Sequence, residues 1–402
     1  MKIFVQIAAY RDPQLVATIK SMIENAKRPK NLRIGIARQF HPDDKFDDLS
    51  EYEKDKRFRI LNIPHQESKG VCWARHQVQQ VYQDEEYTLQ IDSHMRFAPN
   101  WDDEMIKMIK QLQKKGHKKP LLTGYVSSFD PDNDPAGRVQ EPWRMAFDRF
   151  IPEGAVFFLP ETIPGWQQLK EPVTARFYSA HYCFTLGQFS TEVQHNPEYY
   201  FHGEEISIAA RAYTWGYDLF HPHKPLIWHE YTRKGRTKQW DDDKTWGQKN
   251  SHSHLTNRKL FGMDGETQEG HDGPYGFGTE RSLRDYEKYS GIHFAKKSFQ
   301  NKLALDGVSF TIPKGKVFGL IGPNGAGKTT LIRILNQILE PSAGQILIAG
   351  IPLNAQHVSA FGYLPEDRGL YREMTVLDHL VFLARIRGLN RGQALNAART
   401  WL

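Results

Sequence analysis

The chain has 402 residues, enough for two or three domains of ordinary size. Apolar residues make up 39% and aromatic residues 12%, a composition that excludes an intrinsically disordered chain. No apolar run approaches the roughly 18 residues that a membrane span requires. The amino end shows no secretory cleavage site, and Cys72 and Cys183 are too few for a disulfide framework. We therefore expect a cytoplasmic protein.

The net charge of +6 lies entirely in the last quarter of the chain. Residues 297–402 carry 12 Lys and Arg against six Asp and Glu, whereas residues 1–296 carry 41 of each sign. Fifteen of the 17 histidines also lie in the first part. A neutral first part gives no reason to expect a nucleic-acid partner. The change in composition predicts two domains, 1–296 and 297–402.

Strands and helices alternate along the first 91 residues. Apolar runs predict strands at 3–8, 32–37, 58–63 and 87–91. Asp12 and Pro13, a favoured cap and first-turn pair, predict a helix after the first strand, and apolar periodicity predicts another over 70–82. This alternation is typical of an α/β domain whose largely parallel sheet is covered by helices. Such sheets bind their ligands at the carboxyl ends of the strands.

Asp92 and His94 follow the last of these strands, separated only by Ser93. A carboxylate and an imidazole at this edge can hold a divalent cation if a third ligand and a phosphate oxygen complete the shell. The alternative is an ordinary turn at the end of a strand.

Candidates for the third ligand lie between residues 199 and 233. A short strand at 225–228 precedes His229, which an ordinary surface histidine would also explain. Glu204 and Glu205 precede a helix predicted over 206–215, where acidic residues also favour the helix dipole.

Six sequence blocks in one register carry a resemblance to a known family. They are IAAYRDP near the start, KGVCWARHQ at 69–77, LQIDSHMRFAPNWD at 89–102, FHGEEISIAARAYTWGYDLF at 201–220, IWHEYTR at 227–233 and YGFGTERSLRDYEKYSGIHF at 275–294. Residues 1–296 resemble the GlcNAc-type glycosyltransferases, which include cytoplasmic enzymes that add GlcNAc to protein hydroxyproline. That family is similar to the polypeptide N-acetylgalactosaminyltransferases. The resemblance implies a GT-A fold, a nucleotide-sugar donor, a divalent metal and retention of anomeric configuration.

The same resemblance implies roles for individual residues. Asp92 and His94 take the place of the family's metal-binding Asp-x-His, and His229 that of a later histidine ligand. Mn²⁺ is the expected ion, with another divalent cation as the alternative, and it would bridge the two phosphates of a UDP-sugar, for which UDP-GlcNAc is the expected donor.

Four further residues are implied around the donor. Arg75 and Arg11 would approach the nucleotide. Glu204 or Glu205 would face the sugar or the acceptor hydroxyl, and the sequence leaves open which one acts.

Other residues that attract attention have simpler explanations. Five large aromatic residues that a sugar-binding site would use are expected in the core: Trp143, Trp166, Tyr199, Tyr200 and Trp215. The acidic run 241–243 predicts a solvated turn. His252, His254 and His271 lack a spacing that requires a metal.

A phosphate-binding loop stands in the second domain. The segment 322–329 follows a strand predicted at 317–321 and opens a helix. Glycines let backbone amides approach phosphate oxygens, while a lysine and a hydroxyl supply charge and a Mg²⁺ ligand. The nucleotide-binding residues expected here are Asn324, Gly325, Gly327, Lys328, Thr329 and Thr330.

From Lys297 onward the chain resembles the ATP-binding subunit of ABC transporters. The resemblance implies ATP and Mg²⁺ at the loop, Phe299 stacked on adenine, and a membrane permease as partner if the segment is functional. Glu366 stands where many members have glutamine, and the family's first strand, signature motif, catalytic carboxylates and switch histidine have no counterpart in the sequence. Because those groups position Mg²⁺ and the attacking water, we expect an incomplete P-loop domain without ATP hydrolysis and with uncovered apolar surface.

The sequence thus predicts a metal-dependent transferase that moves a sugar to a hydroxyl acceptor, which is a protein, a glycan or a small molecule. Two alternatives stay open: an ABC transporter subunit with an appended transferase-like domain, and a binding module that keeps the nucleotide-sugar pocket without transfer.

Overall fold

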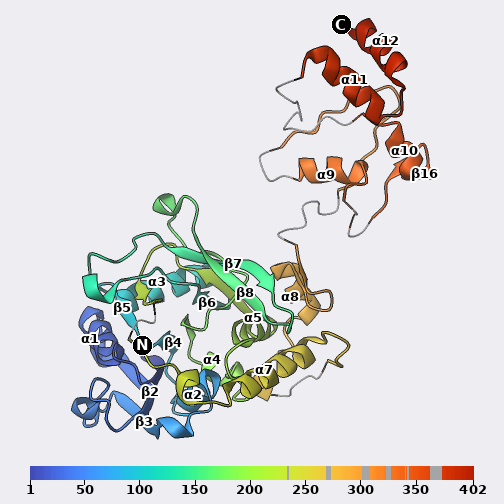
Figure 1. The fold of residues 1–402 in the computed structure, drawn as a ribbon. Coiled ribbons are helices and arrows are strands. Elements are labelled where there is room, and N and C mark those ends of the chain that lie inside the picture. Colours follow the sequence, from blue (N-terminus) through green and yellow to red (C-terminus); the bar gives the residue numbers. More distant parts are fainter. Residues whose placement is uncertain are drawn as a thin grey trace. The chain divides into compact units, whose positions relative to one another are not determined.

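The computed structural model describes residues 1–232, 235–268, 273–300, 308–322, 327–339, 341, 344–362 and 374–402. The chain forms two compact units, Met1–Asn301 and Lys302–Leu402 (Figure 1). The short strand β14 (Ser298–Phe299) pairs with β13 (Ile292–His293), so residues 298–299 belong to the first unit.

A mixed eight-stranded sheet forms the centre of the first unit, in the order β3–β2–β1–β4–β10–β6–β11–β9. Its strands are β1 (Ile3–Tyr10), β2 (Leu32–Phe40), β3 (Phe58–Pro64), β4 (Tyr87–Asp92), β6 (Lys119–Thr123), β9 (Val173–Thr174), β10 (Tyr182–Leu186) and β11 (Tyr217–His221). The first four in this order are parallel, and β10 runs antiparallel to both β4 and β6. The α/β prediction is confirmed, although the sheet is less parallel than expected.

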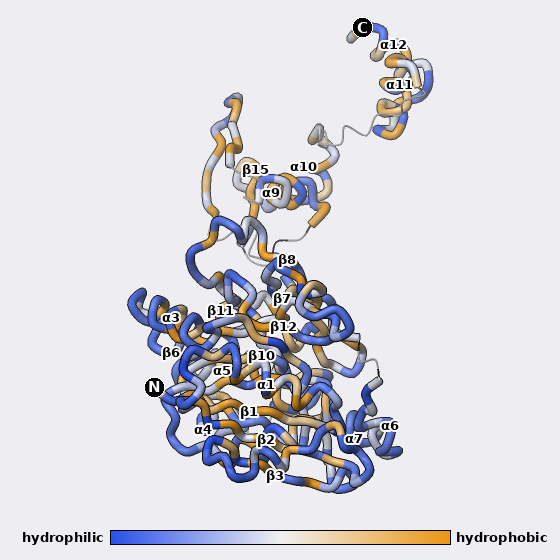
Figure 2. The backbone as a smooth tube through the Cα atoms, turned by 90° about the vertical axis from the view of Figure 1, so that its left-hand side faces the viewer, coloured by the Kyte–Doolittle hydropathy of each residue, from blue (hydrophilic) through white to orange (hydrophobic). Residues whose placement is uncertain are grey.

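Helices cover both faces of this sheet. One face packs against α1 (Leu15–Asn25) and α3 (Trp101–Lys114), and the other against α2 (Val71–Gln79) and α5 (Glu204–Thr214). Successive side chains of β1 point to opposite faces of the sheet. Ile7 packs in the hydrophobic cluster that includes α1 and α3, and Phe4 packs on the other face against α2. In Figure 2 the central strands are largely hydrophobic and the outer segments largely hydrophilic.

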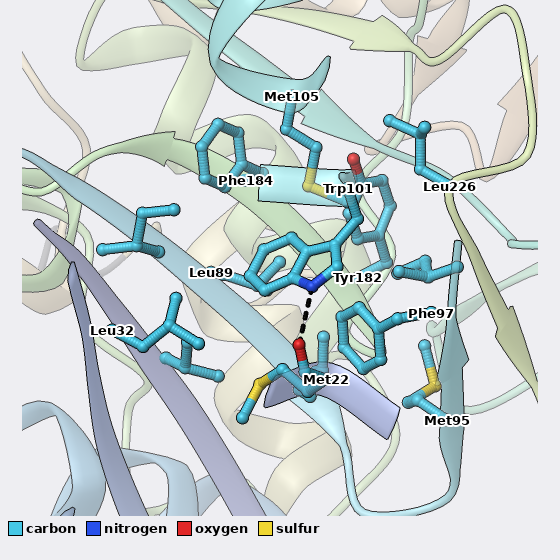
Figure 3. Close-up of a cluster of buried hydrophobic side chains, with 14 of the residues drawn as sticks. Met22, Leu32, Leu89, Met95, Phe97, Trp101, Met105, Tyr182, Phe184 and Leu226 are labelled. Carbon is cyan, nitrogen blue, oxygen red and sulfur yellow. Dashed lines mark hydrogen bonds between the residues drawn. The ribbon is translucent and has the colours of Figure 1, made fainter. Parts of the chain in front are cut away.

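The α1 and α3 cluster surrounds a completely buried tryptophan (Figure 3). The indole Nε1 of Trp101 donates a hydrogen bond of 2.9 Å to the Met22 carbonyl oxygen. The ring fills the core while its one polar atom is satisfied, which keeps α1 and α3 together on one face of the sheet.

Smaller elements complete the first unit. Its other helices are α4 (Phe189–Glu192), α6 (Gln239–Asp242), α7 (Trp246–Phe261) and α8 (Leu283–Ser290), and β7 (Trp143–Phe150) pairs with β8 (Val156–Thr162). The ladder of β5 (Met95–Phe97) and β12 (Ile227–His229) is antiparallel and sets His229 opposite Met95. This pairing brings the end of β12 beside the end of β4.

The described residues of the second unit form four helices and two strands of two residues each. They are α9 (Lys328–Leu335), β15 (Leu347–Ile348), β16 (Ile351–Pro352), α10 (Ala355–Ser359), α11 (Val376–Ile386) and α12 (Arg391–Trp401). The strand predicted at 317–321 is wrong: these residues form no strand, and Val317 and Ile321 are almost fully exposed. A strand needs neighbours to accept its backbone hydrogen bonds, and the described part of this unit supplies none for this segment. Across the described residues, no helix is both long enough and apolar enough to span a bilayer.

Candidate metal and nucleotide site

Asp92, His94 and His229 converge at the carboxyl end of β4. One ligand atom from each lies within 4.8 Å of the others, and no further such group of three occurs among the residues that the structure describes. The Asp92 Oδ2 atom is 3.6 Å from His94 Nε2 and 3.3 Å from His229 Nε2. The distant histidine thus meets the Asp-x-His pair through the β5–β12 ladder.

The three side chains fit a divalent cation. Ligand atoms bound at about 2.1 Å and at right angles around one ion lie about 3 Å apart, close to the distances seen here. The His94 Nδ1 atom faces Asp12 Oδ2 at 2.7 Å, a contact that directs Nε2 toward Asp92. Burial lowers the pKa of His229 to about 4, so its ring is neutral near pH 7 and keeps a lone pair for a metal.

Arg75 connects the cluster to Glu204. Its Nη2 donates to Asp92 Oδ1 at 2.6 Å, and its Nη1 lies 2.7 Å from both Glu204 oxygens. Burial alone would raise the pKa of Glu204, but Arg75 and His195 outweigh it and lower that pKa to about 2. Burial likewise opposes ionisation of Asp92, yet Arg75 and His229 hold its pKa well below the usual range. Both carboxylates are therefore anionic at neutral pH.

Glu205 has a different environment from its neighbour. It accepts hydrogen bonds of 3.0 Å from the Tyr125 hydroxyl and from the Ala180 backbone N–H. Burial raises its pKa to about 7, with a contribution from the negative charge of Glu204. Glu205 can therefore gain or lose a proton near neutral pH.

A pocket of about 190 Å³ opens on the cluster of Asp92, His94 and His229. Its lining comes from β1, the start of α2, the end of β4 and a segment beginning at Arg236: Ala8, Tyr10, Asp12, Gly70, Val71, Arg75, Asp92, Ser93, His94, Tyr200, Phe201, His229, Arg236, Thr237, Lys238, Gln239 and Trp240. Gly70 has φ +112°, and a Cβ there would lie 2.7 Å from the Tyr200 ring. A glycine is thus required where the chain enters α2.

Arg11 does not line this pocket, but its ion pairs connect the end of β1 to the loop after β2 and to α6. It pairs with Asp44 Oδ2 at 2.7 Å and with Asp242 Oδ2 at 2.9 Å, and the Tyr10 hydroxyl donates to the same Asp242 oxygen. The prediction of a solvated turn at 241–243 is correct in part: Asp241 and Asp242 are exposed, but they end the four-residue helix α6, and Asp242 is held by Tyr10 of β1 and by Arg11.

Four residues near the cluster were not predicted as part of a site. Asp12 accepts from the Ser93 hydroxyl at 2.7 Å in addition to its contact with His94. Arg236 contacts His94, lies 3.4 Å from Asp12 Oδ2 and pairs with Glu230 Oε2 at 3.1 Å. The His181 ring stacks on His229 with centroids 4.5 Å apart. Of these four, only Glu230 could have been suspected from the sequence, because it directly follows His229.

Among the remaining first-unit candidates that the structure describes, Tyr200 alone lines the pocket of about 190 Å³. Tyr199 and Tyr200 are buried, with Tyr200 in the pocket wall, while Trp143, Trp166 and Trp215 are half-buried. His252 and His254 lie in α7, and His271 lies outside the described residues.

In the second unit, Gly327 precedes α9 with φ +82°, and Thr329 and Thr330 lie in the first turn of that helix. The Lys328 Nζ donates to the Gly322 carbonyl oxygen at 2.5 Å. Asn324, Gly325 and Glu366 lie outside the described residues. Phe299 lies in β14 of the first unit, stacked on Phe147 with centroids 4.1 Å apart, so adenine stacking stays a prediction without support from its position.

A second cavity, of about 550 Å³, adjoins the cluster through residues that directly follow Asp12 and His229 in the chain. It is lined by Pro13, Gln14, Ser128, Phe129, Asp130, Pro131, Asp132, Gly137, Glu230, Tyr231 and Thr232. The backbone N–H of Glu230 donates to the His94 carbonyl oxygen, which links this cavity to the candidate metal ligands.

Comparison with known proteins gives a family match for each part of the chain. A model described as "Glycosyltransferase (GlcNAc)" matches residues 2–56 and 43–296, and a model described as "ABC transporter" matches residues 305–402. Both predicted resemblances are thereby confirmed, and the mixed sheet agrees with the GT-A expectation.

Curated relatives described as ABC transporter or export ATP-binding proteins match about a quarter of the chain. The uncharacterized ABC transporter ATP-binding protein YhaQ of Bacillus subtilis is 43% identical over 111 residues, covering 28% of this chain and 37% of the relative. Nod factor export ATP-binding protein I of a Rhizobium species is 42% identical over 98 residues, covering 24% and 32%. The chain spans about a third of the length of these relatives.

Solved structures with low overall similarity align with part of the chain. GalNAc-T7, crystallised with UDP, GalNAc and Mn²⁺, has a TM-score of 0.45 and 16% identity, covering 60% of this chain and 46% of that chain. TarS of S. aureus, in complex with UDP-GlcNAc, has a TM-score of 0.39 and 12% identity, covering 60% and 61%.

Proposed function

Because the chain belongs to the GlcNAc glycosyltransferase family, we propose that its first unit transfers GlcNAc from UDP-GlcNAc to a hydroxyl acceptor in a Mn²⁺-dependent reaction that retains anomeric configuration. The observation that carries this proposal is the convergence of Asp92, His94 and His229 beside a pocket at the carboxyl end of β4. The donor and the stereochemistry follow from the family.

The side chains around the pocket suit a nucleotide diphosphate. Asp92, His94 and His229 would hold the cation, which when bound supplies positive charge to the leaving diphosphate. Arg75 and Arg236 line the same pocket and add fixed positive charge. Tyr200 and Trp240 supply aromatic surface for the nucleoside.

Of the two candidate glutamates, Glu205 is better suited to exchange a proton. Glu204 is held as an anion by Arg75 and His195, whereas the pKa of Glu205 is about 7. The 550 Å³ cavity beside Tyr231 is the proposed acceptor side, because it adjoins the metal ligands without sharing the lining of the smaller pocket.

The second unit is proposed to bind ATP with Mg²⁺ through Lys328, Thr329 and Thr330 without hydrolysing it. The alternative, a transport subunit with an appended domain, is not favoured, because the ABC model matches residues 305–402 only while the glycosyltransferase model matches most of the chain. A permease partner belongs to that alternative.

A donor screen tests the proposal. We expect UDP release from UDP-GlcNAc when Mn²⁺ is present, loss of release on chelation, and recovery when Mn²⁺ is restored. Release that is unaffected by chelation would overturn metal dependence, and release from none of a panel of nucleotide sugars would overturn the transferase assignment.

A further inference from the structure

A buried chain of polar side chains runs from the middle of the sheet to the metal ligand Asp92. Its members are Gln90 on β4, His195 in the segment before α5, Glu204 at the start of α5, and Arg75 on α2. These four residues are between 1% and 5% exposed. Four separate segments of the first unit thus meet behind the cluster.

Each link in this chain is short. The Gln90 Nε2 donates to the Ala180 carbonyl oxygen at 2.6 Å, which turns the amide Oε1 toward His195 Nε2, 2.5 Å away. The His195 Nδ1 lies 2.7 Å from Glu204 Oε1. Arg75 then contacts both Glu204 oxygens and continues to Asp92 Oδ1.

The last link decides which oxygen of Asp92 faces the histidines. Arg75 occupies Oδ1, so Oδ2 is the atom within 3.6 Å of both His94 and His229. If Arg75 were free to turn, the Asp92 carboxylate could rotate and Oδ2 would lose this position. Glu204 holds Arg75 with both oxygens and does not itself line the pocket.

Stability alone does not explain these buried charges. Removing ions from water costs several kcal/mol each, and apolar side chains of similar volume often give an equally stable core. The charges have an additional use if they hold a metal ligand in one orientation, since contacts behind such ligands commonly set metal affinity.

We propose that Glu204, with His195 behind it, is a positioning residue that holds Asp92 through Arg75 and so preorganises the cation site. This inference rests on the metal site of the proposed function. It assigns Glu204 to the support of the site rather than to contact with the sugar, and it gives His195 a role.

The test is titration of the full chain with Mn²⁺ alone, followed by the electron paramagnetic resonance signal of the free ion. We expect Glu204→Gln and His195→Leu to weaken Mn²⁺ binding by about 10-fold to 100-fold. His195→Asn keeps a polar group near Glu204 and should recover part of that loss.

Glu85→Gln is the matched control. Glu85 is 2% exposed and pairs with Arg59 at 2.5 Å, near the start of β4, whereas Asp92 ends that strand. This variant neutralises another buried carboxylate that pairs with an arginine, and it should bind Mn²⁺ as the wild type does. Thermal unfolding of every variant identifies those that fold.

Folded Glu204→Gln with wild-type Mn²⁺ affinity would overturn the positioning role while leaving the metal site intact. The positioning role would also be overturned if Glu85→Gln weakened Mn²⁺ binding as much as Glu204→Gln does. A wild-type chain that binds no Mn²⁺ would overturn the metal site and this inference together. If His195→Leu does not fold, Glu204→Gln and His195→Asn decide the result.

Discussion

Two apolar runs of similar length have opposite environments in the two units. Residues 3–8 form most of β1, which pairs with β2 and β4, and Ile7 is completely buried. Residues 317–321 form no strand, and Ile321 is 95% exposed. The comparison shows that an apolar run becomes a strand only where neighbouring strands accept its hydrogen bonds and helices cover its side chains.

The two candidate nucleotide sites differ in the same way. In the first unit, the sheet and the β5–β12 ladder bring together residues that lie 137 positions apart, Asp92 and His229. In the second unit, Lys328 donates to the carbonyl oxygen of Gly322, six positions earlier in the same loop. A site assembled from distant segments depends on its surrounding fold, whereas a phosphate loop is encoded in one short segment.

The largest effect is expected on UDP release when a residue of the Asp92, His94 and His229 cluster is replaced. Asp92→Asn and His229→Ala should each lower Mn²⁺-dependent UDP release by about 10³-fold, because a metal ligand contributes several kcal/mol of charge stabilisation. Turnover assays with UDP-GlcNAc measure this loss. Asp43→Asn, a change at an exposed carboxylate, serves as the control, and unchanged turnover in both ligand variants would refute the site.

A matched pair of substitutions tests the comparison of the two apolar runs. Ile7→Ala should lower the free energy of unfolding of the first unit by about 2–5 kcal/mol, since it leaves a cavity in a packed core. Ile321→Ala removes the same atoms from an exposed side chain and should change stability by about 0.5 kcal/mol or less. Denaturant unfolding followed by tryptophan fluorescence and circular dichroism measures both. Equal effects would show that residues 317–321 are packed in solution.

A smaller effect is expected from pH at Glu205. Its pKa is about 7 in the folded chain, above the usual value, so the folded state binds this proton more tightly than the unfolded state does. The resulting stabilisation is present at low pH and is lost as the pH rises to 7. Relative to Glu205→Gln, which stays neutral, the wild type should lose about 2 kcal/mol between pH 5 and pH 8. Unfolding curves of both proteins at each pH check this; a constant difference would show that the pKa is not raised.

The smallest effect is expected for ATP. Phosphate release from ATP and Mg²⁺ should not exceed that of the buffer, because the carboxylates that position the ion and the attacking water have no counterpart in residues 297–402. Release that scales with the concentration of the chain, and that persists in Asp92→Asn, would assign hydrolysis to the second unit.

Short-range patterns predicted much of the first unit. The strand series up to Asp92, the helices that follow Pro13 and Gly70, and the Asp-x-His at the end of β4 all depend on nearby residues. The roles of Asp12 and Arg236 were not predictable in this way. Asp12 was recognised only as a helix cap, and it does accept the Gln14 N–H, but its second oxygen serves His94, 82 residues later.

By itself the sequence determined the family, through the resemblance of six blocks in one register. Composition and local spacing determined the alternation of strands and helices and placed residue types that suit a cation at the end of β4. The tertiary structure decided which glutamate is held by Arg75 and which is left with a pKa near 7, and it decided that residues 317–321 do not form a strand. The physical reason is the same in each case: burial, ion pairing and strand pairing depend on segments that meet only after the chain has folded.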